Sequence, residues 1–155
     1  MAKKTVAKLI TYRDFSESWS WTTKVACKGI QVWTRSKYFH TEVWIDGYRI
    51  TADTRLGVII RTTTNWDHVK KYADIKEIEI QEDKIKEALD FAYSQEGKDY
   101  DWKGIWLSQF IPADIHDKNK WFCNEISGEV LKKAGAKGII KDTNEYNPGS
   151  FQELF

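Results

Sequence analysis

A two-residue turn near the middle of the chain constrains the fold more than any other feature of the sequence. Asp46-Gly47 favours the positive φ angles of a tight turn, and it separates two β-prone segments, Phe39–Ile45 and Tyr48–Asp53. A two-residue loop also determines the pairing register, because one more loop residue would shift every opposing side chain. The sequence therefore predicts a β-hairpin of two antiparallel strands over 39–53.

One face of this hairpin carries four polar side chains. Side chains alternate along a strand, so His40 and Glu42 share a face. The two-residue loop places Asp53 opposite His40 on that face. It places Thr51 opposite Glu42. This arrangement is expected for a functional site, but a solvent-exposed strand face would show the same pattern.

Hydrophobic periodicity predicts the remaining elements. Strands are expected at Thr5–Tyr12, Val58–Thr63 and Ile75–Ile80, and helices at Trp21–Thr34, Glu82–Glu96 and Phe122–Ala134, with a short terminal helix through Phe155. Strands that alternate with helices in this order, around a clear hairpin, predict an α+β fold: a mainly antiparallel sheet packed with helices. A length of 155 residues predicts a single domain spanning residues 1–155.

Composition excludes several classes of partner. Lys and Arg total 24 against 23 Asp and Glu, so no net field attracts nucleic acid or an anionic membrane. No window approaches the apolar length of a transmembrane segment, and no signal region is visible, which predicts a soluble, cytoplasmic chain. The 8 Trp, 7 Tyr and 7 Phe could form a base-stacking surface, a sugar platform or a heavy core, and the core is favoured.

The two cysteines have different surroundings. Cys123 lies at the start of a predicted helix, where free backbone N–H groups and the helix dipole stabilise a thiolate and can bind an oxyanion. From position alone, a small buried hydrophobe is the favoured interpretation of Cys123, because buried free cysteines are common. Cys27 lies among apolar residues of an amphipathic helix and is expected to fill the core.

No cofactor or metal is predicted. His68 is expected in a loop, and His116 lies between Asp114 and Asp117 without the further ligands that a metal site needs. The sequence contains no phosphate-binding loop, dinucleotide fingerprint or zinc-ligand spacing.

Three segments together resemble a known family: 39–47 (FHTEVWIDG), 97–104 (GKDYDWKG) and 121–125 (WFCNE). They are similar to the circularly permuted branch of the NlpC-type papain-like cysteine peptidases, which includes phage and bacterial members and is related to lecithin retinol acyltransferase. The resemblance covers roughly Thr5 to Ala136. His40 precedes Cys123 here, which is the permuted order.

The resemblance implies a role for each candidate residue. Cys123 would be the nucleophile and His40 the general base and acid, with a polar group on the next strand, Thr51 or Asp53, orienting the imidazole. Tyr100 would lie beside the nucleophile. Glu42 would hold a substrate amine or tune His40. The sequence departs from the family pattern at Asn124, where Ser is usual, and in lacking an unambiguous orienting residue.

The expected function is a cysteine peptidase or amidase that cleaves an amide bond in peptidoglycan stem peptides or a related peptide. Two alternatives stay open: hydrolysis or transfer of a lipid acyl group at the same site, and a non-catalytic interaction protein of phage origin. In the lipid alternative, an acyl slot would be lined by aromatic residues, namely Trp102, Trp106, Phe110, Trp121 and Phe122. A monomer is expected; if phage-encoded, it would act in the host cytoplasm or after lysis.

Overall fold

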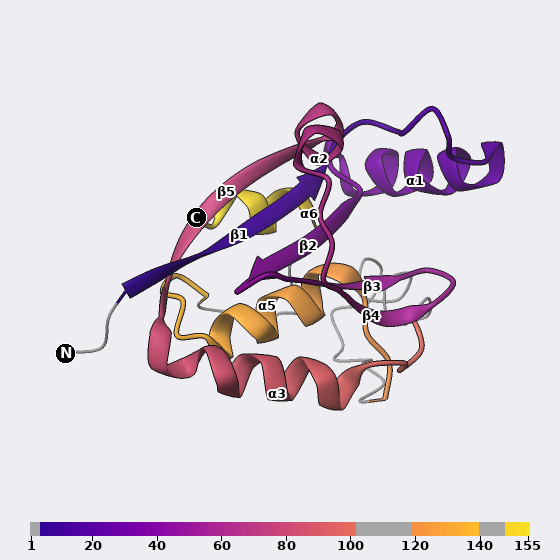
Figure 1. Cartoon of the computed structure of the whole chain (residues 1–155). Helices are drawn as coiled ribbons and strands as arrows, with labels where there is room; N and C mark the ends of the chain where they lie inside the picture. Colours follow the sequence, from indigo (N-terminus) through magenta and orange to yellow (C-terminus); the bar gives the residue numbers. More distant parts are fainter. Residues whose placement is uncertain (1–3, 102–118, 140–147) are drawn as a thin grey trace.

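The computed structural model describes residues 4–101, 119–139 and 148–155, and it has an α+β architecture (Figure 1). The strands are β1 (Lys4–Tyr12), β2 (His40–Ile45), β3 (Tyr48–Asp53), β4 (Gly57–Arg61) and β5 (Ala73–Gln81). The helices are α1 (Trp21–Thr34), α2 (Trp66–Tyr72), the 3₁₀ turn η1 (Glu82–Lys84), α3 (Ile85–Gln95), α5 (Cys123–Lys133) and α6 (Pro148–Glu153). The predicted class, an antiparallel sheet packed with helices, is confirmed.

The five strands form one antiparallel sheet in the order β4-β3-β2-β1-β5. The turn between β2 and β3 has the predicted backbone, with φ of 47° at Asp46 and 87° at Gly47. The strands pair as Val43↔Ile50, Trp44↔Arg49 and Ile45↔Tyr48, which is the register that a two-residue loop requires. The local turn signal therefore gave the correct alignment of the hairpin.

Two hydrophobic clusters lie on opposite faces of the sheet. Leu9 and Ile10 are neighbours on β1 and point to opposite sides, and they belong to different clusters. The larger cluster lies between the sheet and α5, with α3 packed against α5 (Figure 1). The smaller cluster includes Phe39 and Tyr72 and receives partly buried side chains from α1 and α2.

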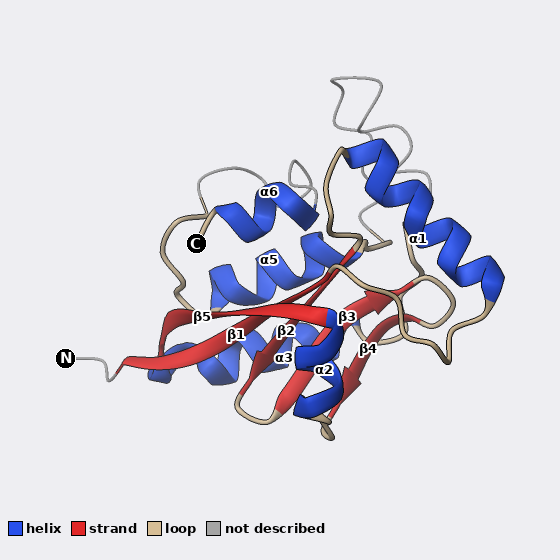
Figure 2. Cartoon of the chain, turned by 90° about the horizontal axis from the view of Figure 1, so that it is seen from above, coloured by secondary structure: helices blue, strands red, loops and turns tan. Residues whose placement is uncertain are grey.

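Helix α1 contributes little to either core. None of its residues is buried, and Trp21, Val25 and Val32 are 76%, 50% and 69% exposed. It stands apart from α3 and α5 in both views (Figures 1 and 2). Cys27 was expected to fill the core; it is partly buried and packs, with Ile30, against the smaller cluster, so it lies at the edge of that core.

Helix α2 is the element that the sequence pattern did not predict. It is seven residues long, too short for a 3.6-residue period to stand out, and it places His68 on a helix instead of in a loop. The side chain of Asn65 caps it by accepting from the backbone N–H of His68 at 3.1 Å. Asn65, as a capping residue, was a local signal for a helix start, which hydrophobic periodicity alone does not detect.

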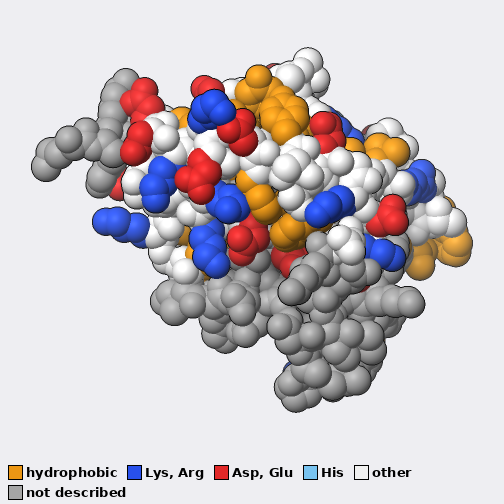
Figure 3. Space-filling view, turned by 90° about the horizontal axis from the view of Figure 1, so that it is seen from below, with side chains coloured by type: hydrophobic (Ala, Val, Ile, Leu, Met, Phe, Trp, Pro, Cys, Tyr) orange, Lys and Arg blue, Asp and Glu red, His pale blue; other side chains and the backbone are white. Residues whose placement is uncertain are grey.

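Surface charge is mixed on the face in Figure 3, where Lys and Arg side chains alternate with Asp and Glu over the described residues. No helix among the described residues is long and apolar enough to cross a membrane. On this face, no patch of one sign stands out that would attract a polyanion.

Gly57 brings the segment that carries Tyr100 against the sheet. At the start of β4, the backbone N–H of Val58 donates to the carbonyl oxygen of Lys98 at 2.8 Å, and Gly97 donates back to Val58 at 2.9 Å. Gly57 itself has φ of 70°, and a Cβ there would overlap the carbonyl oxygen of Lys98. A side chain at this position would therefore separate the two segments.

The substitution Gly57→Ala is expected to lower the free energy of unfolding by at least about 2 kcal/mol, because strain at positive φ adds to a backbone clash. Gly97→Ala is the matched control: its φ is 80°, but nothing lies within 4 Å of the added methyl group. It is expected to cost only about 1 kcal/mol. Chemical denaturation of both variants measures the difference, and equal costs would contradict the role of the close approach.

Candidate functional site

His40 is the first residue of β2, and one of its ring nitrogens has two partners. Nε2 lies 3.3 Å from Oε1 of Glu42 and 3.3 Å from Oγ1 of Thr51. The Thr51 hydroxyl donates its hydrogen to the carbonyl oxygen of Thr41 at 2.8 Å, so toward His40 it can only accept. A carboxylate also accepts. Nε2 must therefore carry the hydrogen, which leaves the lone pair of the neutral ring on Nδ1.

Glu42 is held from three strands. Its Oε2 pairs with Nε of Arg49 on β3 at 2.9 Å and accepts from the hydroxyl of Tyr12 on β1 at 3.5 Å, while Oε1 faces His40. Its side chain is only 6% exposed. A buried carboxylate persists only when its oxygens are matched by donors and positive charge, and both oxygens are matched here.

The electrostatics favour a charged pair. Burial alone would raise the pKa of Glu42, but the hydrogen bond and charge of His40 and the charge of Arg49 lower it. Burial likewise would lower the pKa of His40, yet hydrogen bonds to Cys123 and Glu42 raise it to about 10. The imidazole is therefore held as a cation at neutral pH, between a carboxylate and a thiol.

Cys123 is the first residue of α5, as its predicted position at a helix start required. Phe122, the residue before it, is the N-cap. Its side chain makes no capping hydrogen bond, so it does not serve as an acceptor for the backbone N–H groups of the first turn. Cys123 is buried, and its Sγ lies 3.5 Å from Oδ1 of Asn124. His40 and Tyr100 both form side-chain hydrogen bonds with the same thiol.

A short β-bridge between two segments that are distant in the sequence holds Tyr100 beside the thiol. It pairs with Trp121 in parallel, through hydrogen bonds from Asp101 N to Trp121 O at 2.9 Å and from Trp121 N to Asp99 O at 3.0 Å. Burial raises the pKa of Tyr100 well above its ordinary value, and the charge of Cys123 and the hydrogen bond to it add to this. The phenol therefore stays a neutral donor beside the thiol.

Asp53 does not have the role that the predicted register indicated, which was to orient the imidazole of His40. Its Oδ1 accepts from the backbone N–H groups of Arg55 and Leu56, at 2.9 and 3.1 Å, and so holds the β3–β4 turn. It is not among the hydrogen-bond partners of His40 in the described residues. Of the two candidates for an orienting group on β3, Thr51 contacts the imidazole and Asp53 does not.

A cavity of about 530 Å³ opens beside His40 and Tyr100. One wall comes from α1 and the loop before it, including Trp19, Thr23 and Cys27. Another wall comes from β2, β3, the β3–β4 turn and β4, with three arginines, Arg49, Arg55 and Arg61. Its lining includes His40 and Tyr100, the two residues that hydrogen-bond Cys123, so the cavity lies next to the residues that contact the buried thiol.

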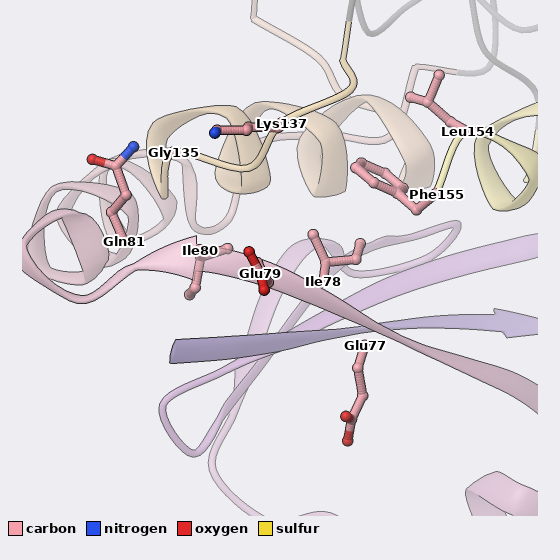
Figure 4. A pocket seen from close by; sticks show the side chains of 9 residues that line it. All are labelled: Glu77, Ile78, Glu79, Ile80, Gln81, Gly135, Lys137, Leu154 and Phe155. Carbon is pink, nitrogen blue, oxygen red and sulfur yellow. The ribbon is translucent and has the colours of Figure 1, made fainter. Parts of the chain in front are cut away.

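A second cavity, of about 370 Å³, lies between β5, the loop after α5 and the end of the chain (Figure 4). Lys137 and Phe155 approach it from one side of β5, whereas Glu77 points to the other side. Among the described residues, its lining contains no Cys, His, Ser or Thr, so they offer neither a nucleophile nor an imidazole base there. The first cavity, in contrast, is bordered by His40.

Other residues that the sequence singled out lie elsewhere. His68 borders the first cavity, and its ring packs on Tyr72 with centroids 4.8 Å apart. No group of three potential metal ligands occurs in the described parts of the chain, and the Asp114, His116 and Asp117 cluster lies outside them. Trp121 and Phe122 are buried in the main core and do not line the cavity; the other residues of the suggested acyl slot, Trp102, Trp106 and Phe110, lie outside the described residues.

Sequence reasoning missed Tyr12 and Arg49, which hold Glu42. The signal for Arg49 was present: the predicted register sets Arg49 opposite Trp44, two residues from Glu42 on the same face of the hairpin. The position of Tyr12 depends on the pairing Tyr12↔His40 between β1 and β2, which no local turn determines.

The raised pKa of His40 has a consequence for stability. A group whose pKa is higher in the folded state stabilises the fold fully below its unfolded pKa, near 6.5, and loses that effect as the pH rises through about 10. The stability advantage of the wild type over His40→Gln should therefore shrink by more than about 1 kcal/mol between pH 6.5 and 10. Urea denaturation at both pH values measures it, and a constant difference would contradict the charged pair.

Three separate elements thus bring their side chains to one point: His40 from β2, Tyr100 from the segment after α3, and Cys123 from α5. Cysteine and histidine in contact, with a carboxylate behind the histidine, can support nucleophilic chemistry. Comparison with protein-family models gave no matching family, and comparison with curated proteins gave no matching relative.

Proposed function

We propose that this protein is a cysteine hydrolase that cleaves an amide bond through an acyl-enzyme on Cys123. One observation supports this most: the thiol of Cys123 hydrogen-bonds His40, whose Nε2 faces Glu42 at 3.3 Å. A cationic imidazole beside a thiol stabilises the thiolate, which is the reactive form. The carboxylate in turn stabilises the imidazolium and keeps its ring in one orientation.

Each step has a residue to perform it. The Cys123 thiolate attacks the substrate carbonyl, forming the S–C bond of a tetrahedral intermediate whose oxyanion can bind backbone N–H groups at the start of α5. His40, protonated on both nitrogens, gives the Nδ1 proton to the departing amine as the C–N bond breaks. Nδ1 then takes a proton from water, which attacks the thioester and releases the acid and the thiolate.

Glu42 is the proposed orienting residue, with Thr51 assisting. Both accept at Nε2, but only the carboxylate carries charge to balance the imidazolium. Asp53 holds the neighbouring turn instead. Tyr100, a neutral donor to the thiol, is placed to hydrogen-bond the substrate or the intermediate.

The proposed fold family is the circularly permuted papain-like one. The order of the groups, with the base on an early strand and the nucleophile at the start of a later helix, agrees with the permuted arrangement. The proposed substrate is a peptide amide, in peptidoglycan stem peptides or a related peptide. Acyl esters form the second arm of a substrate screen, because a Cys-His pair can cleave either bond.

Replacement of each cysteine tests the proposal directly. Cys123→Ala should abolish hydrolysis of whichever cell-wall fragment or peptide amide the wild type cleaves, whereas Cys27→Ala should retain it. Iodoacetamide at pH 7 should alkylate Cys123 at least about tenfold faster than Cys27, because burial and the charge of Cys123 raise the pKa of Cys27 to about 11. Peptide mapping by mass spectrometry measures both rates. Equal, slow alkylation would instead favour an interaction protein without catalysis.

Glu42→Gln tests which residue orients the imidazole. Loss of the carboxylate should slow alkylation of Cys123 at pH 7 at least about tenfold, which is the effect of about 1.4 kcal/mol on a barrier. Asp53→Asn is the matched control, because an amide oxygen can still accept from the turn N–H groups. It should change the rate less than about twofold. The reverse ranking would identify Asp53 as the orienting group.

A further inference from the structure

Two arginines lie directly opposite each other in the sheet. Arg49 on β3 pairs with Arg61 on β4, so both side chains point to the same face, the one that borders the cavity. Like charges at such a pair destabilise a sheet unless anions offset them. Glu42 offsets Arg49 at 2.9 Å, which leaves the charge of Arg61.

Arg55 and Arg61 carry the remaining positive charge at the cavity. The charge of Arg61 contributes to lowering the pKa of Glu42, but among the described residues no carboxylate lies within ion-pair distance of Arg55 or Arg61. Arg55 is positioned by a hydrogen bond from Nη2 to Oγ1 of Thr23 at 3.1 Å, which joins the β3–β4 turn to α1 across the cavity. Asp53, the nearest acid in sequence, already accepts two backbone N–H groups with Oδ1.

The described lining of this cavity is therefore cationic, although the chain as a whole is nearly neutral. Among the described residues, its acids are Glu42 and Asp53, against Arg49, Arg55 and Arg61. Glu42 is used by His40 and Arg49, so an incoming anion meets the guanidinium groups of Arg55 and Arg61. Guanidinium is the side-chain group best matched to carboxylate, because its two N–H groups can bind both oxygens.

We propose that Arg61, with Arg55, forms a subsite for a carboxylate of the substrate. The inference rests on the proposed function: His40 and Tyr100 line the same cavity as Arg55 and Arg61, so the bound carboxylate belongs to a residue near the scissile amide. The substrate class is thus an acidic peptide amide. The carboxylate belongs to an acidic side chain or to a free carboxyl terminus, which present the same group to arginine.

Three small electrophiles of similar size test the subsite. They are chloroacetyl-glutamic acid α-amide, with a side-chain carboxylate; chloroacetyl-glutamine, with a free α-carboxylate; and chloroacetyl-glutamine amide, which is neutral. In each, the Cys123 thiolate displaces chloride and forms an S–C bond. One of the two anionic probes should alkylate wild-type Cys123 about tenfold faster than the neutral probe, as measured by mass spectrometry under second-order conditions. Which one reacts faster identifies the source of the carboxylate.

Variants test whether Arg61 causes the preference for an anionic probe. In Arg61→Gln the ratio of anionic to neutral rates should fall to about 1, and Arg61→Lys should retain a preference of several-fold. Arg35→Gln removes the same charge at the end of α1, outside the cavity lining, and should leave the ratio unchanged. This control separates a local subsite from an effect of net charge.

The outcomes distinguish the two proposals. If iodoacetamide alkylates wild-type Cys123 faster than Cys27 but the three probes react alike, the subsite is overturned and the cysteine hydrolase stands. If the anionic preference persists in Arg61→Gln, the assignment to Arg61 is overturned. If iodoacetamide does not select Cys123, the proposed function itself fails. The comparison of probes on the wild type needs no variant, so it holds even if Arg61→Gln does not fold.

Discussion

The buried carboxylate of Glu42 is the interaction on which the arrangement of the site depends. A lone carboxylate in this position would cost several kcal/mol, so the fold must supply donors and positive charge from its surroundings. They come from three neighbouring strands: Tyr12 on β1, His40 on β2 and Arg49 on β3. The same pairing that aligns the strands thereby fixes the imidazole, because a shift of one residue would turn these side chains to the other face.

The parts of the fold that local signals determine were predictable. Asp46-Gly47 forms a turn with two positive φ angles, which leaves one register for β2 and β3. The helix Cys123–Lys133 lies within the predicted range Phe122–Ala134, because its apolar residues recur at helical spacing. The polar face of the hairpin followed from alternation alone. All these signals are local: each depends on a few residues that are neighbours in the sequence.

The remaining features depend on contacts between distant segments. The sequence offered Thr51 and Asp53 as orienting groups, but a turn needs two backbone N–H groups satisfied, and Asp53 serves the turn. Register cannot show that competition. Tyr12 meets Glu42 only once β1 has paired with β2. Helix α1 has the predicted bounds, yet no pattern indicated that it would bury none of its residues, because burial depends on where the rest of the chain lies.

The residues of the proposed chemistry and those of the proposed selectivity lie in parts of the fold that are packed differently. Cys123 begins a helix that packs on β2 and β3, and Ile126 and Val130 of that helix are fully buried against the sheet. The distance between thiol and imidazole is therefore set by close-packed core, which resists small displacements. The parts of the cavity wall that carry the proposed subsite are different: Arg55 lies on an exposed turn, Arg61 is exposed at the end of β4, and the facing helix α1 has no buried residue. Substitutions in those parts can change the charge and shape of the cavity without moving His40 relative to Cys123, so the proposed carboxylate preference can change independently of the reacting groups.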